Sequence, residues 1–397
     1  MTRRFTSSQL LLLAASFLIT LGSFAVLPYM SVLLHERLGL GLGAVGAVLA
    51  MASLVQFGGG VVGAALARRI GLRATMLVAL AVRTAGFACF VPGLGRPWLA
   101  VVALFLVSAG AALYLPANKA HLVAGRPAAE RPRLLAASGS AFNAGIALGP
   151  PAAAPFVLGE PGVLFGAVAV LFALVGVAHL LLPEVPDEPS EATRSGPAGW
   201  SAGAVPFAYT ILAVYVFMFF QHYLALYAIP RTSAGYYGVV LMGYALLLVV
   251  VQPLLADWTS KLPYARALRW GFGTLALGLA TIATGGHWGI AAGAVLICLA
   301  EAVLFLRNDL AALERSPDPP ATVFARQRLA AGLGASAAAL LGGPLYATAE
   351  RTTTASHFWL LAAAQAVTLP LLLALALGSR RPPPKPTPYP EASAPRR

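Results

Sequence analysis

One carboxylate, Glu301, lies in the middle of a long apolar stretch, whereas the other acidic residues fall in polar segments or near the ends of apolar ones. An ionised carboxylate in hydrocarbon costs several kcal/mol, so such a group is protonated, paired or in contact with water. A carboxyl group in such a place can carry a proton across an apolar barrier. Glu301 is therefore the candidate proton carrier, and the alternative is a structural Glu that is hydrogen-bonded to a neighbouring helix.

Several polar and aromatic residues inside apolar stretches favour ligand binding. Gln221 and His222 are embedded among aromatic residues, and aromatic surfaces with a few polar groups suit bulky amphipathic ligands. The alternative is that these aromatic residues only pack or anchor the chain at an interface. The candidate cavity residues are Tyr29, Tyr114, Asn118, Asn143, Tyr215, Gln221, His222 and Phe305.

Motifs of catalytic and metal sites are absent from the sequence. It contains no HExxH, no GxSxG, no His-rich cluster and no phosphate-binding Gly-Lys motif. Cys89 and Cys298 fall inside apolar runs, which indicates neither a disulfide framework nor a metal site. We therefore expect no enzyme activity, no metal and no cofactor. A polytopic membrane enzyme or a sensor is the alternative from a different class, although a sensor should carry an added soluble domain.

The elements that position these residues are predicted to be membrane-spanning helices. Of the 397 residues, 59% are hydrophobic and 10% are charged, which is too little charge to cover the surface of a soluble protein. The first apolar run continues without a small-residue cleavage pattern, so we expect an uncleaved first span. A span needs about 20 apolar residues, and the predicted spans are 9–34, 43–67, 73–92, 97–119, 133–158, 161–183, 204–229, 235–256, 266–284, 287–308, 323–349 and 355–378.

Two polar segments divide the chain. Residues 184–203 are rich in Pro, Glu, Ser and Gly, a composition that cannot bury a core and is typical of a flexible linker. This linker separates an N-terminal bundle of six spans, 1–183, from a C-terminal bundle of six, 204–378. The Pro-rich tail, 379–397, is predicted to be disordered and extended.

The net charge of +13 would suggest a nucleic-acid partner in a soluble protein, but the positions of the charges indicate a membrane instead. With the N-terminus in the cytoplasm, 22 of the 27 Lys and Arg residues fall in cytoplasmic segments, four in outer loops and one, Arg83, inside a span. Cytoplasmic loops carry such an excess of Lys and Arg. We therefore predict a multi-pass protein of a bacterial plasma (inner) membrane with both termini in the cytoplasm.

The two predicted halves carry the same landmarks in the same order. The fourth and tenth spans end near Asn118 and Asn308, and the fifth and eleventh reach Gly149-Pro150 and Gly343-Pro344. Repeats of this kind place a substrate site between the halves, near the bilayer midplane. Because the interruptions recur at matched positions, we expect spans two, five, eight and eleven to form moving seams; static packing is the alternative.

These motifs resemble the major facilitator superfamily over nearly the whole chain. Gly63-Ala-Ala-Leu-Ala-Arg-Arg-Ile-Gly71-Leu-Arg73 is similar to the loop signature after the second span. Three further segments resemble bacterial multidrug exporters of the drug:proton antiporter branch. They are Gly139, Gly145, Gly149 and Pro150 of the fifth span, Arg83-Thr-Ala-Gly-Phe87, and Gly22-Ser-Phe…Pro28 of the first span. The resemblance implies an all-α membrane protein with twelve transmembrane helices in two pseudo-symmetric six-helix bundles, the major facilitator fold, working by alternating access.

The same resemblance implies roles for the buried charges. The tenth span, with Glu301, lines the central cavity in the superfamily, whereas the third span, with Arg83, is peripheral. We therefore expect Arg83 to be structural, with anion binding as the alternative. The implied function is export of a small amphipathic or apolar compound by proton antiport, through a monomer in the lipid bilayer. The alternative is an importer or facilitator of a small polar nutrient.

Two departures from the family pattern bear on mechanism. In the family, the Asp of the loop signature helps to lock the cytoplasmic side, but this chain has Arg68 at that position. We therefore predict that Asp257, in the second half, is the only acidic residue of the cytoplasmic latch. Its partner would be Arg131 or Arg133. The fourth span lacks the Arg that the antiporter branch carries before a Gly, here Gly110, which counts against proton coupling. The predicted gating and latch residues are Arg68, Arg73, Asp257, Arg266, Gly149, Pro150, Gly343 and Pro344.

Overall fold

The computed structural model describes residues 5–127, 130–184, 200–316, 320–352 and 354–378, and every regular element in these ranges is helical. The first two membrane spans each consist of several helical elements. The first span is α1 (Ser7–Val26), η1 (Leu27–Tyr29), α2 (Met30–Val32) and η2 (Leu33–Arg37), and the second is α3 (Leu42–Gly58) and α4 (Gly60–Ile70). The third to sixth are α5 (Leu72–Gly93), α6 (Pro97–Val123), α7 (Arg131–Ala153) and α8 (Pro161–His179).

The second half of the chain contains the corresponding six spans. It consists of α9 (Trp200–Ala228) with η4 (Ile229–Arg231), α10 (Ala234–Lys261), α11 (Tyr264–Ile282), α12 (His287–Arg315), α13 (Pro320–Thr352) and α14 (Ser356–Gly378). The predicted twelve-helix fold is confirmed. Most of the predicted linker and nearly all of the predicted tail lie outside the described residues, so the exact domain boundaries stay predictions.

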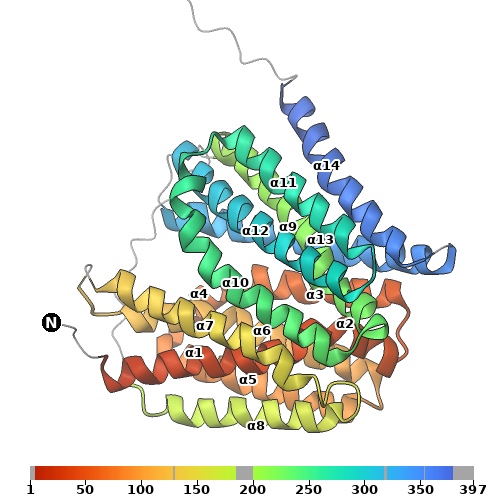
Figure 1. The fold of residues 1–397 in the computed structure, drawn as a ribbon. Coiled ribbons are helices and arrows are strands. Elements are labelled where there is room, and N and C mark those ends of the chain that lie inside the picture. The colour runs from red at the N-terminus through yellow and green to blue at the C-terminus, as the bar shows by residue number, and fades with distance from the viewer. Residues whose placement is uncertain (1–4, 128–129, 185–199, 317–319, 353, 379–397) are drawn as a thin grey trace, which may run out of the picture.

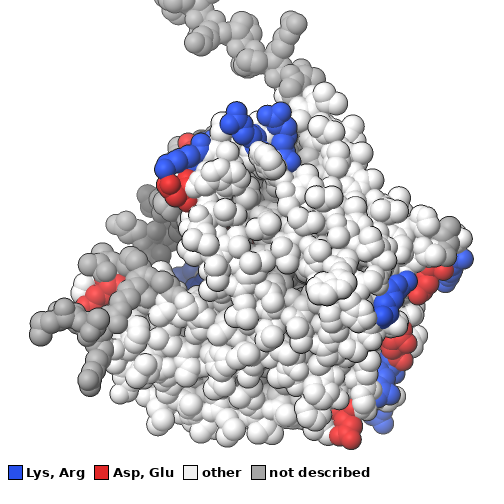
Figure 2. Space-filling model, viewed as in Figure 1, with Lys and Arg blue, Asp and Glu red and all other residues white. Residues whose placement is uncertain are grey.

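The outer surface has the composition of a lipid-facing protein. Nine helical stretches of the described residues are long and apolar enough to cross a membrane, and α3 is a shorter apolar helix. On α8 and the turn after it, five aliphatic side chains at helical spacing are 55% to 80% exposed: Val163, Val170, Leu174, Val177 and Leu181. Figure 2 shows charged side chains near the ends of the molecule and a broad uncharged surface between them. Such an apolar band is what hydrocarbon requires.

Local sequence signals explain where several helices begin. Thr6 and Gln9 form a capping box at the start of α1, because each side chain accepts a hydrogen bond from the other residue's backbone N–H. Ser233 caps α10 by accepting a hydrogen bond from the backbone N–H of Tyr236 at 3.0 Å. Gly71, between α4 and α5, has a φ of 83°, a value that favours glycine and allows the sharp reversal there.

The helices pack in the same way within each half. In the N-terminal half α5 packs on α6 and α8, α1 on α7, and α3 on α6. The corresponding helices of the C-terminal half make the corresponding pairs: α11 with α12 and α14, α9 with α13, and α10 with α12. The internal repeat of the sequence is therefore a structural repeat, and the two halves form the lower and upper parts of Figure 1.

Candidate substrate cavity

Contacts between the halves concentrate on two helix pairs, α3 with α13 and α7 with α10, with further contacts from η1 and α2 to α9. We call the end of the molecule where α1 begins and α6 ends the terminal side, and the opposite end the far side. In Figure 1 the two halves meet at the end marked by α2 and diverge towards the end where the N-terminus lies. The sequence predicted spans two, five, eight and eleven as seams, and these four helices supply both pairs.

A pair of tyrosines closes the far side between the halves. The hydroxyl of Tyr29 donates a hydrogen bond to the Pro150 carbonyl at 2.8 Å and lies 3.4 Å from the Ala234 carbonyl in the other half. The hydroxyl of Tyr237 donates to the Pro28 carbonyl at 3.0 Å. The two rings meet edge to face, with centroids 5.1 Å apart, and both side chains are buried. We call this cluster the tyrosine seal.

Helices α3 and α13 approach closely where residues 42–50 of α3 meet residues 336–343 of α13. A Cβ atom on Gly343 would overlap the carbonyl oxygen of Leu42, and one on Gly46 would overlap a carbonyl oxygen of α13. Further along, the Ser336 hydroxyl lies 3.1 Å from the Ala50 carbonyl. Glycine is required where backbones approach so closely. This pair of helices therefore closes the far side by backbone contact.

The close contact between α7 and α10 is formed by a proline of α7 and a glycine of α10. A Cβ on Gly238 of α10 would lie 2.9 Å from Pro151 Cα of α7. Gly149 points the other way, because its Cβ would lie 2.8 Å from the Leu21 carbonyl of α1. Pro150 and Gly343 thus lie at inter-half contacts, whereas Gly149 supports packing within the N-terminal half.

A cavity lies between the halves and reaches from the terminal side towards the tyrosine seal. Its outer part, 810 Å³, is lined by α1, α3, α6, α7 and α13, and its inner part, 250 Å³, by α1, α3, α6 and α9. Gln56 and Phe57 line both parts, so the two parts adjoin. Pro28 lines the inner part, and its carbonyl accepts the hydrogen bond from Tyr237 in the seal. The tyrosine seal therefore lies at the end of the cavity that points to the far side.

The N-terminal half contributes the polar wall of the outer cavity. Asn118 is 3% exposed, and its Nδ2 donates to the Ser16 hydroxyl at 2.9 Å. Its Oδ1 is buried and accepts no hydrogen bond from the described residues. The Tyr114 hydroxyl lies 3.0 Å from His179 Nε2, while His179 Nδ1 lies 2.7 Å from the Val175 carbonyl. Asn118 therefore keeps one acceptor for a ligand, whereas the hydroxyl of Tyr114 is already engaged.

The C-terminal half contributes fewer polar groups to the wall. Met218, Gln221 and His222 of α9 line the inner cavity. The Nε2 atom of His222 is buried and has no hydrogen-bond partner among the described residues. A neutral imidazole has one nitrogen that donates and one that accepts. His222 therefore keeps a ring nitrogen for a hydrogen bond with a ligand.

Two cations face the outer cavity from opposite halves. Lys119 near the end of α6 and Arg328 on α13 both line it. Both side chains are exposed in this conformation. Among the described residues that line the outer cavity, none is acidic. The mouth, defined by Lys119 and Arg328, is therefore positively charged.

Glu301 lies on α12 outside the residues that line the cavity. Its Oε2 is buried and has no hydrogen-bond partner among the described residues. One turn further on, the ring of Phe305 meets Phe217 of α9 edge to face at 5.6 Å. One turn earlier, the thiol of Cys298 lies 3.7 Å from the Tyr244 carbonyl of α10. Glu301 is therefore a buried carboxyl group between helices of the C-terminal half.

Arg83 has partners that fix it within the N-terminal half. Its side chain is 2% exposed, and Nη2 donates to the Ser23 hydroxyl at 2.6 Å. The guanidinium lies 4.5 Å from the centroid of the Phe172 ring, within range of a cation–π interaction. Its Nε is buried and lacks a partner among the described residues. These contacts lie within the N-terminal half, and the structural role of Arg83 stays a prediction.

The other predicted residues fall into two groups. Tyr29, Asn143, Tyr215 and Phe305 are not among the residues that line the two cavity parts, and the Tyr215 hydroxyl instead donates to Gln365 Oε1 at 2.5 Å. Of the gating candidates on the terminal side, Arg68 and Arg266 are exposed, Arg73 lies 3.7 Å from Glu184, and Asp257 lies 2.6 Å from Lys261. The side chains of Arg131 and Arg133 lie outside the described residues, so the latch stays a prediction.

Sequence reasoning missed much of the outer wall. The additional residues that line it include Ser16, Thr20, Lys119, Ser138, Phe142, Phe324 and Arg328. In the sequence, Lys119 and Arg328 do not differ from the other cations at span ends. The only signal for a shared location is that they lie at the predicted cytoplasmic ends of spans in opposite halves of the repeat.

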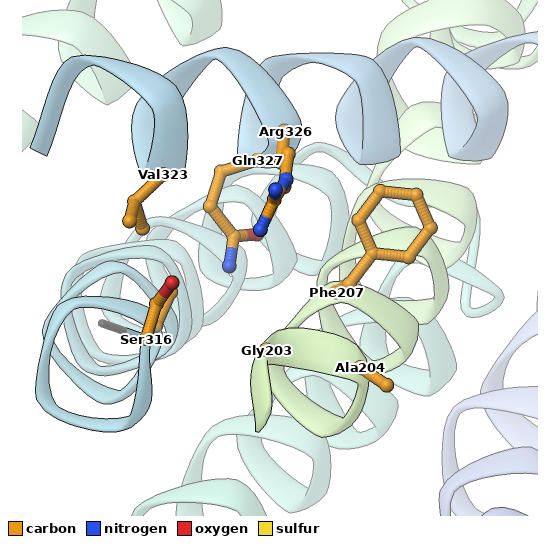
Figure 3. A pocket seen from close by; sticks show the side chains of 8 residues that line it. Gly203, Ala204, Phe207, Ser316, Val323, Arg326 and Gln327 are labelled. Atoms are coloured by element: carbon orange, nitrogen blue, oxygen red, sulfur yellow. The ribbon is translucent and has the colours of Figure 1, made fainter. Parts of the chain in front are cut away.

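A separate small pocket lies at the terminal side of the C-terminal half. Figure 3 shows Arg326 and Gln327 of α13 pointing between the end of α12 and the start of α9, towards Ser316 and Phe207. Its volume is 20 Å³, which is enough for about one water molecule. This pocket is too small for a substrate and belongs to the packing of the half.

Comparisons with known proteins agree with the fold. An uncharacterized MFS-type transporter of Mycobacterium tuberculosis is 27% identical over 387 residues, which cover 90% of each chain. The multidrug resistance protein MdtH of Cronobacter sakazakii is 34% identical over 112 residues, 28% of each chain. Two solved structures share the fold at low sequence identity. The nucleoside transporter NupG superposes with a TM-score of 0.73 at 14% identity, covering 94% of this chain and 99% of NupG. The POT family transporter PepTSo superposes with a TM-score of 0.74 at 12% identity, covering 95% and 99%.

The match to a family model decides the class. The model of the Major Facilitator Superfamily matches residues 12–306, from within α1 of the N-terminal half to within α12 of the C-terminal half. A cavity between two repeated helical bundles is the expected place for a small-molecule substrate in such a protein. The chain belongs to the Major Facilitator Superfamily and is a multi-pass membrane transporter.

Proposed function

We propose that the protein exports small amphipathic compounds from the cytoplasm of a bacterium by proton antiport, with its terminal side facing the cytoplasm. The observation that carries this proposal is the cavity between the halves, which is open at the terminal side and closed at the far side by the tyrosine seal. The excess of Lys and Arg in segments on the terminal side supports the orientation. Similarity over part of the chain to a multidrug resistance protein supports export.

The inter-half contacts support alternating access. The two halves meet through neutral helix pairs with little side-chain bulk, at Gly343 with Leu42 and at Gly238 with Pro151. Such contacts can separate without breaking ion pairs in a medium of low dielectric constant. Rocking about them would open the far side and close the mouth, so that the cavity faces each side of the membrane in turn.

Glu301 is the proposed proton carrier. Its Oε2 is buried and has no partner among the residues that the structure describes, so the ionised form is unfavourable here. Exchange of its proton then requires a conformational change that brings water or a partner to the carboxyl group, which links protonation to alternating access. One proton moving down 100 mV supplies roughly 2.3 kcal/mol, enough for about a 50-fold gradient of substrate.

A facilitator or importer of a polar nutrient is the second candidate function. The polar wall formed by Ser16, Gln56, Asn118 and Ser138 favours it, because these side chains can hydrogen-bond hydroxyl or amide groups. The two candidates differ in coupling, since a facilitator moves its substrate down its own gradient only.

Transport by purified protein tests the proposal. Proteoliposomes with the terminal side outward and an acidic lumen are given ethidium or 1-naphthalenesulfonate, two probes whose permanent charge prevents passive redistribution with pH. We expect the wild type to accumulate at least one probe in the lumen, and to accumulate more of it with the pH gradient than without. In Glu301→Gln, this increase caused by the pH gradient should disappear. Glu160→Gln, an exposed carboxylate on the far side, is the matched control and should behave as wild type. Full coupling in Glu301→Gln would exclude Glu301 as the carrier, and accumulation of neither probe would contradict export.

A further inference from the structure

We propose that the cavity selects organic anions, with an apolar or aromatic body and one carboxylate, sulfonate or phosphate group that is held between Lys119 and Arg328. This inference rests on the proposed function, because it names the substrate class of the same cavity. It differs from a general preference for amphipathic compounds, since cationic compounds of the same size should be rejected.

The charge of the outer cavity carries the inference. Lys119 comes from the N-terminal half and Arg328 from the C-terminal half, and both line the same 810 Å³ space. Lys119 lies near the end of α6 and Arg328 near the start of α13, so both cations lie at the terminal end of this space. Among the described residues neither forms an ion pair, and the lining residues include no carboxylate. Two neighbouring cations without a counter-charge favour an anion between them.

The rest of the wall specifies what the anion is attached to. Phe57, Phe142 and Phe324 line the outer cavity together with Leu115 and Leu135. These side chains suit an aromatic or aliphatic body, and the volume is within the usual range for sites that take small organic ligands. An inorganic anion would leave this apolar surface in contact with water.

A buried polar group adds a second point of recognition. Asn118 is 3% exposed and lines the outer cavity, one residue before Lys119. Its Nδ2 is held by Ser16, whose hydroxyl lies 2.9 Å from the Leu12 carbonyl and so accepts from Asn118. The unpartnered Oδ1 can therefore accept a hydrogen bond from a hydroxyl or N–H of the ligand. Ligands that carry such a donor beside the acidic group should bind more tightly than those that lack it.

The position of the two cations also suggests that a bound anion promotes closure of the mouth. Lys119 and Arg328 belong to opposite halves and would approach one another as the mouth closes. Without a ligand, repulsion between like charges opposes this movement, and a bound anion removes the repulsion. The anion should therefore promote closure of the mouth, whereas the empty carrier stays open.

Binding measurements with matched probes test the inference. Purified protein in nanodiscs is titrated with three naphthalene compounds that share one ring system: 1-naphthalenesulfonate, 1-naphthalenemethanol and a quaternary naphthylmethyl ammonium. We expect the sulfonate to bind at least about 10-fold more tightly than the other two. Lys119→Gln and Arg328→Gln should each weaken its binding about 10-fold, and the double variant about 100-fold, as expected for the loss of charge-assisted contacts. Arg269→Gln, an exposed cation on α11, is the matched control and should not change binding.

The lipid must be controlled because a phospholipid headgroup is also an anion. The titration is therefore repeated in nanodiscs of phosphatidylcholine with and without phosphatidylglycerol. If the free compound is the ligand, affinity for the sulfonate depends on Lys119 and Arg328 in both lipids. Sulfonate binding that disappears when phosphatidylglycerol is present would identify the lipid headgroup as the occupant and overturn the inference.

The outcomes separate this inference from the proposed function. If the ammonium compound or the alcohol binds as tightly as the sulfonate, or if the double variant binds the sulfonate like wild type, the inference is wrong. Proton-coupled accumulation of ethidium, but not of the sulfonate, would overturn the inference and leave export intact. Binding of none of the three compounds would also contradict the inference.

Discussion

The two ends of the contact between the halves differ in chemistry, although the same helices form both. At the far side, close approach of α3 and α13 and the hydrogen bonds of Tyr29 and Tyr237 join the halves without any charged group. At the terminal side, Lys119 and Arg328 line the open mouth from opposite halves. Neutral contacts join the halves at one end, and two cations line the cavity at the other.

This difference should favour the conformation that is open at the terminal side. Repulsion between Lys119 and Arg328 would rise as the mouth closes, and solvent in the mouth would screen it. Each hydrogen bond of the tyrosine seal contributes about 1 kcal/mol. Both effects favour the same conformation, so a ligand or a proton must supply the free energy that reverses it.

Weakening the far side is the largest single change that the structure suggests. In Gly343→Ala, a Cβ would overlap the Leu42 carbonyl oxygen, so α3 and α13 must separate. Overpacking of this kind costs about 1–3 kcal/mol, which corresponds to a shift of about 5- to 150-fold away from the closed far side. Spin labels at Glu160 and Glu350, which are exposed on the far side, one in each half, should report a longer distance.

The control for this variant is a glycine on a seam helix with open space around it. A Cβ on Gly243 of α10 would meet nothing within 4 Å, so Gly243→Ala should keep the wild-type distance. An unchanged distance in Gly343→Ala would mean that close backbone approach does not hold the far side shut.

Reversing one charge at the mouth should have the next largest effect. Lys119→Glu replaces a repulsion with an attraction to Arg328, and an exposed ion pair contributes about 0.2–1 kcal/mol beyond the repulsion that is removed. We expect the fraction of molecules with a closed mouth to rise about 10-fold at low salt and less at high salt. Spin labels at Ser7 and Trp270, exposed on the terminal side, measure this distance.

Arg269→Glu makes the same change of charge outside the cavity and serves as the control. It should leave the distance between the labels unchanged. If both variants close the mouth equally, net charge at the terminal side is responsible and the facing pair is not.

The sequence predicted the fold well because length, hydropathy and the position of cations are properties of whole helices. It was less informative about which side chains face the cavity. Tyr29 and Tyr215 lie in the same kind of aromatic, apolar sequence as the cavity-lining Gln221 and His222. A membrane helix is apolar on all sides, so hydropathy does not distinguish the face towards the cavity from the face towards lipid.

The buried charges illustrate the same limit. Arg83 and Glu301 were both recognised as charges inside spans, but a sequence does not give their partners. The structure surrounds Arg83 with Ser23 and Phe172, and it leaves one oxygen of Glu301 without a partner among the described residues. That difference separates a structural role from a candidate for proton transfer.

The smallest expected effect concerns the predicted latch on the terminal side. In this conformation the Asp257 carboxylate lies 2.6 Å from Lys261 Nζ, and the two side chains are 79% and 73% exposed. An exposed pair of this spacing on a helix contributes only about 0.3–0.5 kcal/mol. Since α10 packs on α7, closure of the mouth would bring Asp257 towards Arg131 and Arg133 at the start of α7. Asp257→Asn should therefore reduce the closed-mouth fraction about 2- to 5-fold, measured with the labels at Ser7 and Trp270.

Lys261→Gln distinguishes the latch from the pair that is already present. It removes the partner of Asp257 in the open conformation but keeps the carboxylate, so it should leave the closed-mouth fraction unchanged or raise it slightly. Asp257→Asn and Lys261→Gln should then act in opposite directions on the same distance. If both lower the closed fraction equally, the pair with Lys261 is the relevant interaction, and the terminal side closes without an acidic latch.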